Sequence, residues 1–120
     1  MIRKRADFLA ANRGLRVARA GFVLLVNRDA ASDELMRYGI TVTKKIGGAV
    51  VRNRMKRRFR ELLRELLPVH GIVGADHVLI GREGGIERDF ALLRTELIAA
   101  LLRASEGKGD PPRRRKPPAK

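Results

Sequence analysis

The basic side chains of this sequence gather in one stretch, residues 44–67, which reads KKIGGAVVRNRMKRRFRELLRELL. Its first twenty-one residues contain nine Lys and Arg and a single acid, Glu61. Cations in such numbers can bind a polyanion, because each ammonium or guanidinium group can neutralise one phosphate. The competing interpretation is a solvated helix face whose charges pair with one another.

Large apolar residues recur through the same stretch at the spacing of an α-helix. At about 100° per residue they fall within an arc of roughly 120°, and this stripe must pack on the rest of the domain. Its members are Val51, Met55, Phe59, Leu62, Leu63 and Leu66.

The polar residues of this helix form two further surfaces. The side opposite the stripe carries Asn53, Arg57, Arg60 and Arg64. Arg52, Lys56 and Arg60 form an i, i+4, i+8 row along one flank of the stripe. Such a row would overhang a groove between the helix and a sheet.

Ion pairs within the helix cannot neutralise these surfaces, because Glu61 and Glu65 are too few. Like charges four residues apart, as in Arg52–Lys56 and Lys56–Arg60, cost roughly 0.2–0.5 kcal/mol per pair. Repulsion within one helix favours the interpretation that a polyanion binds there over the interpretation of a solvated face. The net charge of the chain, +14, points to the same class of partner. Nucleic acid is the commonest such partner, and charge alone does not exclude an acidic membrane.

The residues just before the helix offer a second feature that suits phosphate. Lys44 and Lys45 end the preceding predicted strand, and Gly47-Gly48 free the backbone where the first helical N–H groups emerge. A helix N-terminus flanked by lysines is a natural phosphate site. The glycines could equally form only a tight turn, and the sequence leaves both interpretations open.

Residues of the types that catalyse reactions or bind metals lie apart in this sequence. His70 and His77 have no carboxylate or cysteine companions at ligand spacing, and His77, at a strand start, is typical of a structural histidine. Glu83, Glu87 and Asp89 are spaced as in a loop and a helix start, where acids are favoured. We therefore predict no catalytic residue and no metal site in the protein itself.

Composition favours one domain with a modest core. The chain has 120 residues, 44% of them hydrophobic, and it has no cysteine, which fits a reducing cytosol. The longest clean apolar run, FVLLV at 22–26, is far too short to cross a bilayer. We expect a soluble, cytoplasmic protein.

The last residues differ from the rest of the chain. Residues 105–120 are basic and rich in proline, so we expect a disordered tail there, either a weak clamp on a nucleic acid or a solubilising end. The tail has a net charge of +4, which leaves +10 on the predicted domain of residues 1–104. The domain is therefore basic without its tail.

Six elements are expected to position the basic helix. The patterns predict a helix at 4–12, strands at 20–27 and 37–43, the basic helix at 49–66, a strand at 76–81 and a last helix at 87–103. Pro68 is expected to end the basic helix. The order αββαβα indicates an α+β domain with helices packed on one small sheet.

At residues 43–63, TKKIGGAVVRNRMKRRFRELL, the sequence resembles the protein subunit of bacterial ribonuclease P. That family carries an Arg-Asn-Arg motif followed by Lys-Arg and a further Arg. The matching residues here are Arg52, Asn53, Arg54, Lys56, Arg57 and Arg60. The family's lead-in to this motif is matched by Lys44, Lys45, Gly47, Ala49 and Val50. The similarity spans about residues 4–103.

This resemblance implies a subunit of the ribonucleoprotein that removes the 5′ leader from precursor tRNA. The catalytic centre would belong to the RNA subunit, with Mg²⁺ bound mainly by RNA. The partners would be that RNA and precursor tRNA, not DNA or a membrane. The family fold also implies a left-handed strand–helix–strand crossover, whereas the general rule is right-handed. The RNA-binding residues that the resemblance implies are Lys44, Lys45, Arg52, Asn53, Arg54, Lys56, Arg57 and Arg60.

The resemblance further implies a cleft for the single-stranded leader between the sheet and the first helix. The corresponding residues are Phe8, Asn12, Leu25, Arg52, Lys56 and Arg60. Asn12 and Leu25 stand where the family often has aromatic residues, and Gly48 stands where Asn is common. Stacking on an aromatic ring contributes roughly 1–3 kcal/mol per base. We therefore expect leader binding here to depend more on charge.

Two other functions would share the basic surface. A ribosomal or general RNA-chaperone protein would have the charge but not the ordered motif. A DNA-binding protein would need an accessible recognition face, whereas the basic helix here has a broad core stripe. The sequence therefore favours the subunit of an endoribonuclease whose RNA partner performs the reaction.

Overall fold

The computed structural model of the chain describes residues 14–27, 37–72 and 74–108. These residues form four strands, two α-helices and two short 3-10 helices. The predicted helix at 4–12, which contains Phe8 and Asn12, lies outside the described residues, as does the predicted tail from residue 109 onward.

The four strands form one mixed sheet in the order β1-β2-β4-β3. They are β1 (Leu15–Ala18), β2 (Phe22–Asn27), β3 (Arg37–Thr41) and β4 (Asp76–Gly81). β2 pairs antiparallel with both β1 and β4, whereas β3 pairs parallel with β4. Parallel neighbours need a long connection, and the basic helix provides it.

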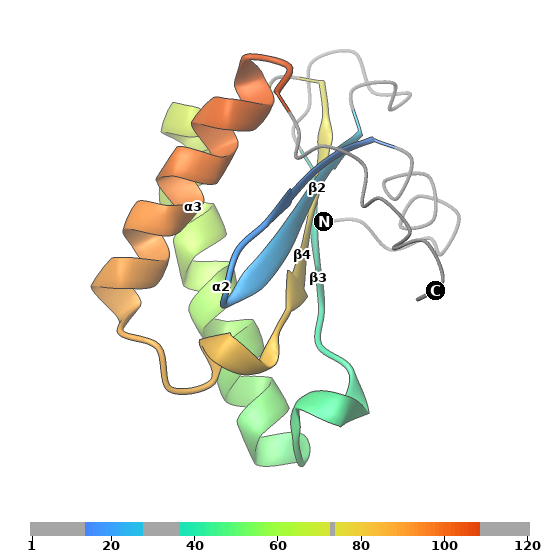
Figure 1. The fold of residues 1–120 in the computed structure, drawn as a ribbon, viewed down its shortest axis with the longest axis vertical. Helices are drawn as coiled ribbons and strands as arrows, with labels where there is room; N and C mark the ends of the chain where they lie inside the picture. Colours follow the sequence, from blue (N-terminus) through green and yellow to red (C-terminus); the bar gives the residue numbers. More distant parts are fainter. Residues whose placement is uncertain (1–13, 28–36, 73, 109–120) are drawn as a thin grey trace, which may run out of the picture.

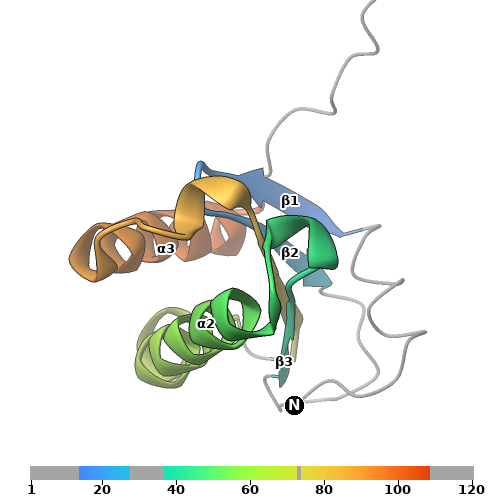
Figure 2. The ribbon, with the colours of Figure 1, turned by 90° about the horizontal axis from the view of Figure 1, so that it is seen from below.

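Two helices cover one face of this sheet (Figure 1, Figure 2). α2 (Ala49–His70) contacts β3 and β4, and α3 (Phe90–Ser105) contacts β1 and β2. The two helices also contact each other, so they form one layer. The predicted α+β class, with helices packed on one small sheet, is confirmed.

The connection from β3 through α2 to β4 is left-handed. In Figure 1 both strands run down the page and α2 returns upward to their left. Figure 2, seen from below, places β3 at the edge of the sheet and the helices again to its left. The path from β3 through α2 to the inner strand β4 therefore turns with the left hand. The resemblance predicted this feature correctly, against the usual right-handed rule.

Alternation along β2 decides which of its side chains enter the main core. Phe22, Leu24 and Val26 pack among the helices, whereas Val23 and Leu25 belong to a smaller cluster on the other face of the sheet. The stripe predicted on the basic helix is buried from Met55 onward, and its first member, Val51, is half-buried.

Close packing fixes the position of α2 over the sheet. A Cβ atom at Gly81 of β4 would meet Sδ of Met55 and lie 3.1 Å from Cγ2 of Val42, so the lack of a side chain here makes room for the Met55 side chain of α2. Phe59 of α2 meets Phe22 of β2 edge to face, with ring centroids 6.4 Å apart. These contacts also set the direction in which the polar surfaces of α2 point.

Pro68 does not end the basic helix, contrary to expectation, because α2 continues to His70. A proline in the last turn removes only one helical hydrogen bond. The backbone N–H of Gly71 still donates to the Leu67 carbonyl at 2.8 Å. Leu66 and Leu67 are buried, so core packing holds the final turn in place.

Other bounds also differ from the expected ones, and β2 begins at Phe22 and α3 ends at Ser105, each two residues later than expected. β1 was not predicted, because a four-residue strand with Arg16 inside it carries little alternation, and its pairing with β2 defines it. β3 ends at Thr41, so the lysines expected at its end lie in the 3-10 helix that follows. α3 begins at Phe90 because the Asp89 carboxylate accepts a hydrogen bond from the Leu92 N–H at 3.2 Å.

Candidate nucleic-acid interface

A glycine turn precedes the N-terminus of α2. The 3-10 helix η1 (Lys44–Ile46) carries both lysines on the surface. Gly47 follows with φ 156° and ψ −167°, a backbone conformation that residues with a side chain rarely adopt. Gly48 is the N-cap of α2 and has no capping side chain, and the first turn has no acid. Both earlier interpretations therefore remain: the glycines make a turn, and the turn leaves a helix N-terminus flanked by lysines.

The outer side of α2 carries the predicted polar residues at the surface. Of the residues predicted on this side, Asn53, Arg57 and Arg64 are exposed and Arg60 is half-buried, and Arg54, which was not predicted there, is also exposed. In the described part of the chain, no carboxylate forms an ion pair with any cation of this group, and the same is true of Arg52, Lys56 and Arg60. The electrostatic repulsion inferred from the sequence is thus present in the folded helix.

The predicted row of Arg52, Lys56 and Arg60 is half-buried along one flank of α2. The other flank faces α3, because Glu65 there forms an ion pair with Arg94 of α3 at 3.0 Å. The row therefore lies on the side toward the edge strand β3. The Nε atom of Arg52 is buried and has no hydrogen-bond partner among the described residues. A buried donor left in this state costs about 1–3 kcal/mol, so an external acceptor there would be favoured.

Arg58 is the cation of α2 that does not belong to this surface. Its guanidinium donates to the carbonyls of Gly85, at 3.4 Å, and Arg88, and it lies 5.7 Å from the ring centroid of Phe90. Sequence reasoning did not separate Arg58 from its neighbours. Its helical angle, on the flank opposite the row, was the signal that could have done so.

Two acids of the helices, Glu65 and Glu96, form ion pairs on the α3 side. Glu96 accepts two hydrogen bonds from Arg88, at 2.6 and 3.1 Å, and this carboxylate raises the pKa of Arg88. Glu65 likewise pairs with Arg94 of α3. The uncompensated positive charge lies on the outer and β3-facing sides of α2.

His77 has a structural environment, as its position in the sequence suggested. It is fully buried, with Nδ1 3.1 Å from the Arg37 carbonyl oxygen and Nε2 accepting from the Ile72 N–H at 3.1 Å. Burial lowers the pKa of His77, so the neutral ring is favoured. Beside it, Arg37 binds the buried Asp76 carboxylate through two hydrogen bonds of 2.7 Å.

The residues expected to line a leader cleft are only partly described. Leu25 is 2% exposed and packs with Val23 and Val78 on the face of the sheet away from α2 and α3. The row on α2 lies on the helix side, at the β3 edge. A single-stranded nucleic acid that contacted both Leu25 and the row on α2 would therefore have to pass around the β3 edge of the sheet.

Two further properties of the described residues concern membranes and metal ions. None of the helices at 49–70 and 90–105 is long and apolar enough to cross a membrane. Among residues 14–27, 37–72 and 74–108, no group of three His, Asp or Glu side chains is placed to hold a metal ion.

Comparisons with known proteins agree on one family. The family model described as Ribonuclease P matches residues 1–105. A ribonuclease P protein component from Erythrobacter litoralis is 73% identical over 116 residues, covering 97% of this chain and 94% of that protein. The RNase P protein from Thermotoga maritima has a similar structure, with a TM-score of 0.74 and 32% identity over 85% of this chain and 94% of that one. The Staphylococcus aureus RNase P protein gives a TM-score of 0.69 at 32% identity, over 86% and 93% of the two chains.

Proposed function

The chain belongs to the ribonuclease P protein family, the protein subunit of a tRNA-processing endoribonuclease, and from this premise we propose how it contacts RNA. The outer side of α2 and the turn before it bind the RNA subunit, and the row on its flank binds the 5′ leader of precursor tRNA. The residues proposed to bind RNA are Lys44, Lys45, Arg52, Asn53, Arg54, Lys56, Arg57 and Arg60. The absence of any carboxylate paired with these cations, within the described chain, is the observation that supports this most.

The role of these residues is to hold RNA in place. Guanidinium groups donate up to five hydrogen bonds in a fixed plane and bind phosphate in a bidentate manner, and the lysines act as point charges. The buried apolar stripe fixes the orientation of α2 when RNA binds. The positions of the bound phosphates therefore follow from the packing of α2 on the sheet. Asn53, which is exposed beside the arginines, can both donate to and accept from RNA groups.

The chemistry of cleavage is proposed to lie in the RNA subunit, with Mg²⁺ held by RNA. Bound there, the metal would polarise the scissile phosphate and activate water. The protein contributes positive charge that lowers the repulsion between two RNA molecules. It should therefore reduce the concentration of Mg²⁺ that the holoenzyme needs.

For the leader, we propose a path along Arg52, Lys56 and Arg60 that turns around the β3 edge toward Leu25. The buried Nε of Arg52 supports this path, because a phosphate oxygen would satisfy a donor that has no partner in the described chain. Phe8 and Asn12 would complete the cleft. Since precursor tRNA is made in the cytoplasm, the protein is proposed to act there.

Reconstitution with the cognate RNA subunit tests this function. Cleavage of precursor tRNA is measured at low Mg²⁺ with and without the protein, and we expect strong stimulation. An unrelated structured RNA serves as competitor, because a general RNA chaperone would bind it equally well. No stimulation, or equal binding of the competitor, would contradict the proposal.

The double variant Arg52→Ala/Arg60→Ala tests the row itself. It should weaken binding of precursor tRNA and lower the slope of log K against log [salt] by about 0.7 to 0.9 per lost phosphate contact. The control is Arg94→Ala, which also removes an arginine but from α3, where it pairs with Glu65. An unchanged slope in the double variant would show that the row does not touch phosphate.

A further inference from the structure

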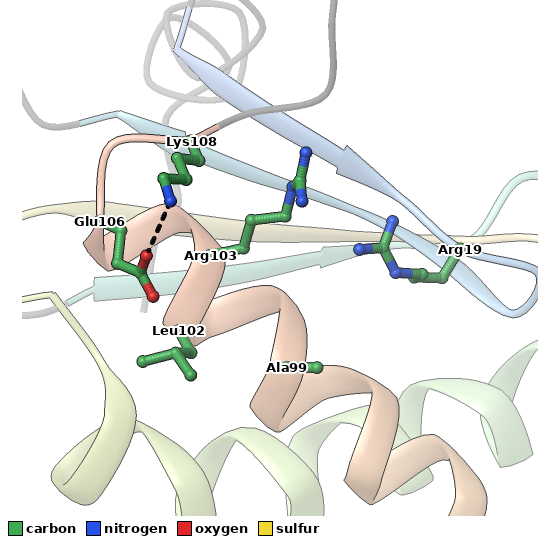
Figure 3. Close-up of a pocket in the computed structure, with 6 residues that line it drawn as sticks. All are labelled: Arg19, Ala99, Leu102, Arg103, Glu106 and Lys108. Atoms are coloured by element: carbon green, nitrogen blue, oxygen red, sulfur yellow. Dashed lines mark ion pairs between the residues drawn. The ribbon is translucent and has the colours of Figure 1, made fainter.

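An open hollow of about 290 Å³ lies at the C-terminal end of α3, beside the turn between β1 and β2 (Figure 3). Arg19 comes from the turn, and the remaining lining residues come from α3 and the residues after it. The lining residues are Arg19, Ala99, Leu102, Arg103, Glu106 and Lys108. None of them belongs to the surface of α2 described above.

The lining combines an apolar floor with a cationic rim. Leu102 is 55% exposed and lines the hollow together with Ala99. Arg19, Arg103 and Lys108 contribute three positive charges. Among the described lining residues the carboxylate is Glu106, which lies 3.3 Å from the Lys108 ammonium. The described lining therefore holds three cations and one carboxylate, and Arg19 and Arg103 make further contacts with their own chain.

The backbone that carries Arg19 is well fixed. The Arg19 N–H donates to the Phe22 carbonyl at 2.8 Å, and the Arg19 carbonyl accepts from Nη1 of Arg82 at 3.0 Å. Nη1 of Arg19 donates to the Ala18 carbonyl at 2.6 Å. In Figure 3 the side chains of Arg19 and Arg103 both lie on the β1 side of α3. The cationic rim is thus held by two elements that pack on each other.

An apolar floor with cations at its rim fits a ligand that has a flat apolar body and an attached negative charge. A nucleotide has this form, and its base can lie on an apolar or guanidinium surface while its phosphate accepts from arginine. The volume of the hollow is close to the lower limit of known small-ligand sites, which suits a single nucleotide. We propose that this hollow binds one unpaired nucleotide of RNA, with the base over Leu102 and the phosphate near Arg19 and Arg103.

This site would contact a different RNA segment from α2. α3 lies at the β1 edge of the sheet and α2 at the β3 edge (Figure 2). Three strand spacings of about 4.8 Å separate the two edge strands. The identification of the ligand as RNA rests on the proposed function. The nucleotide could belong to the RNA subunit or to precursor tRNA, and the experiment separates these two sources.

The chain contains no cysteine, so a single introduced cysteine can carry a unique probe. We would attach iron–EDTA to Leu102→Cys, to Leu92→Cys as the matched control, and to Val50→Cys as the reporter for α2. Leu92 is an exposed leucine of the same helix, and Val50 is 83% exposed in the first turn of α2. Each protein is assembled with the RNA subunit and precursor tRNA, with one RNA labelled at a time.

We expect hydroxyl-radical cleavage of a short unpaired segment from Leu102→Cys that Leu92→Cys does not give, and the labelled strand identifies the source. Cleavage from Val50→Cys but not from Leu102→Cys would overturn the inference and leave the proposed function intact. Equal cleavage from Leu102→Cys and Leu92→Cys would also overturn it. Absence of RNA cleavage from Val50→Cys would count against the proposed role of α2.

A second measurement does not depend on the probe. Arg19→Ala/Arg103→Ala should lower the slope of log K against log [salt] for the RNA that is cleaved by about 0.7 per lost contact with a single strand. Its melting temperature is measured in parallel, since these arginines also contact their own chain. An unchanged slope in a folded variant would contradict the inference. Binding of an acidic peptide with no effect on RNA would show that the hollow has a different ligand.

Discussion

Individual arginines of α2 have different roles although they are neighbours in the sequence. Arg57 is exposed and has no ion-pair partner in the described chain, whereas Arg58 binds carbonyls of the segment before α3. Periodicity placed both residues on a helix. It could not show which segment would meet the flank that carries Arg58, because that contact joins residues 27 and 30 positions apart. Only the folded chain assigns Arg58 to packing and leaves Arg57 exposed on the surface that we propose binds RNA.

Alanine substitution of Arg58 should therefore change stability, whereas alanine substitution of Arg57 should change RNA binding. Arg58→Ala should lower the free energy of unfolding by about 1–2 kcal/mol, because two carbonyls and the Phe90 ring lose a cationic partner. Arg57→Ala should change stability by less than about 0.5 kcal/mol, as is usual for an exposed residue. The slope of RNA binding against salt should fall by about 0.9 for Arg57→Ala and stay constant for Arg58→Ala. Urea unfolding and RNA titration of both variants check this, and a reduced slope for Arg58→Ala would contradict it.

His77 makes the stability of the sheet dependent on pH. Burial lowers its pKa in the folded protein below the ordinary value of 6.5, and protonation would also turn the acceptor Nε2 into a donor facing the Ile72 N–H. Between these two pKa values the unfolded chain binds more protons than the folded one. Stability is therefore fully present above pH 6.5 and is lost as the pH falls below it, by at most about 1.4 kcal/mol per pH unit.

The check is urea unfolding at a series of pH values from about 7.5 to 5 for the natural chain and for His77→Asn. The variant should be less stable at every pH, because it fills the buried site poorly. Its stability should also depend less on pH in this range. Equal pH dependence in the two proteins would show that another group is responsible.

At the scale of elements, patterns predicted best where an element is long or fully buried. The bounds of β4 were predicted as the structure has them, at 76–81. The start of α2 at residue 49 was also correct. Its end was not, because buried leucines in the last turn outweigh the one hydrogen bond lost at Pro68. β1 could not be predicted from its own four residues, since pairing with β2 defines it. The left-handed crossover is likewise beyond local patterns, and only the resemblance indicated it.

The two glycines before α2 offer a matched test of how this element is positioned. Gly47→Ala should destabilise the protein by about 1–3 kcal/mol, because φ 156° with ψ −167° is unfavourable for alanine and its Cβ would lie 3.2 Å from that of Val51. Gly48 has φ −70° and open space around it. Gly48→Ala should therefore stay within about 0.5 kcal/mol of the natural chain, with the loss at the N-cap offset by a less flexible unfolded chain.

Thermal unfolding of Gly47→Ala and Gly48→Ala measures this expected difference in stability. RNA binding should also weaken in Gly47→Ala, because the lysines of η1 and the first N–H groups of α2 would no longer be held together. If both variants unfold at the same temperature, the backbone at Gly47 does not determine where α2 begins.

At the scale of the whole molecule, the cations that should lower the stability of the free protein are the ones proposed to bind RNA. The folded domain keeps a basic helix whose cations lack acidic partners in the described chain. On the other side, Glu65 of α2 pairs with Arg94 of α3, and Glu96 of α3 pairs with Arg88 in the segment before this helix. This arrangement follows from the sequence only in part. The sequence shows the excess of cations, and the fold shows that they are concentrated on the β3-facing and outer sides of α2. A protein with this distribution is less stable alone than it is with its polyanion bound.

Lys56→Gln tests this balance directly, because Lys56 stands four residues from both Arg52 and Arg60. Its removal should stabilise the free protein by about 0.4–1 kcal/mol at low ionic strength, since two repulsive pairs disappear. The gain should vanish near 1 M salt, where the screening length is about 3 Å. The comparison of unfolding at about 0.02 M and about 1 M salt cancels any change in packing, because packing does not depend on screening. The same variant should bind RNA less tightly, so a protein that gains stability here loses affinity. A variant that is less stable than the natural chain by the same amount at both salt concentrations would show that repulsion along the row is absent.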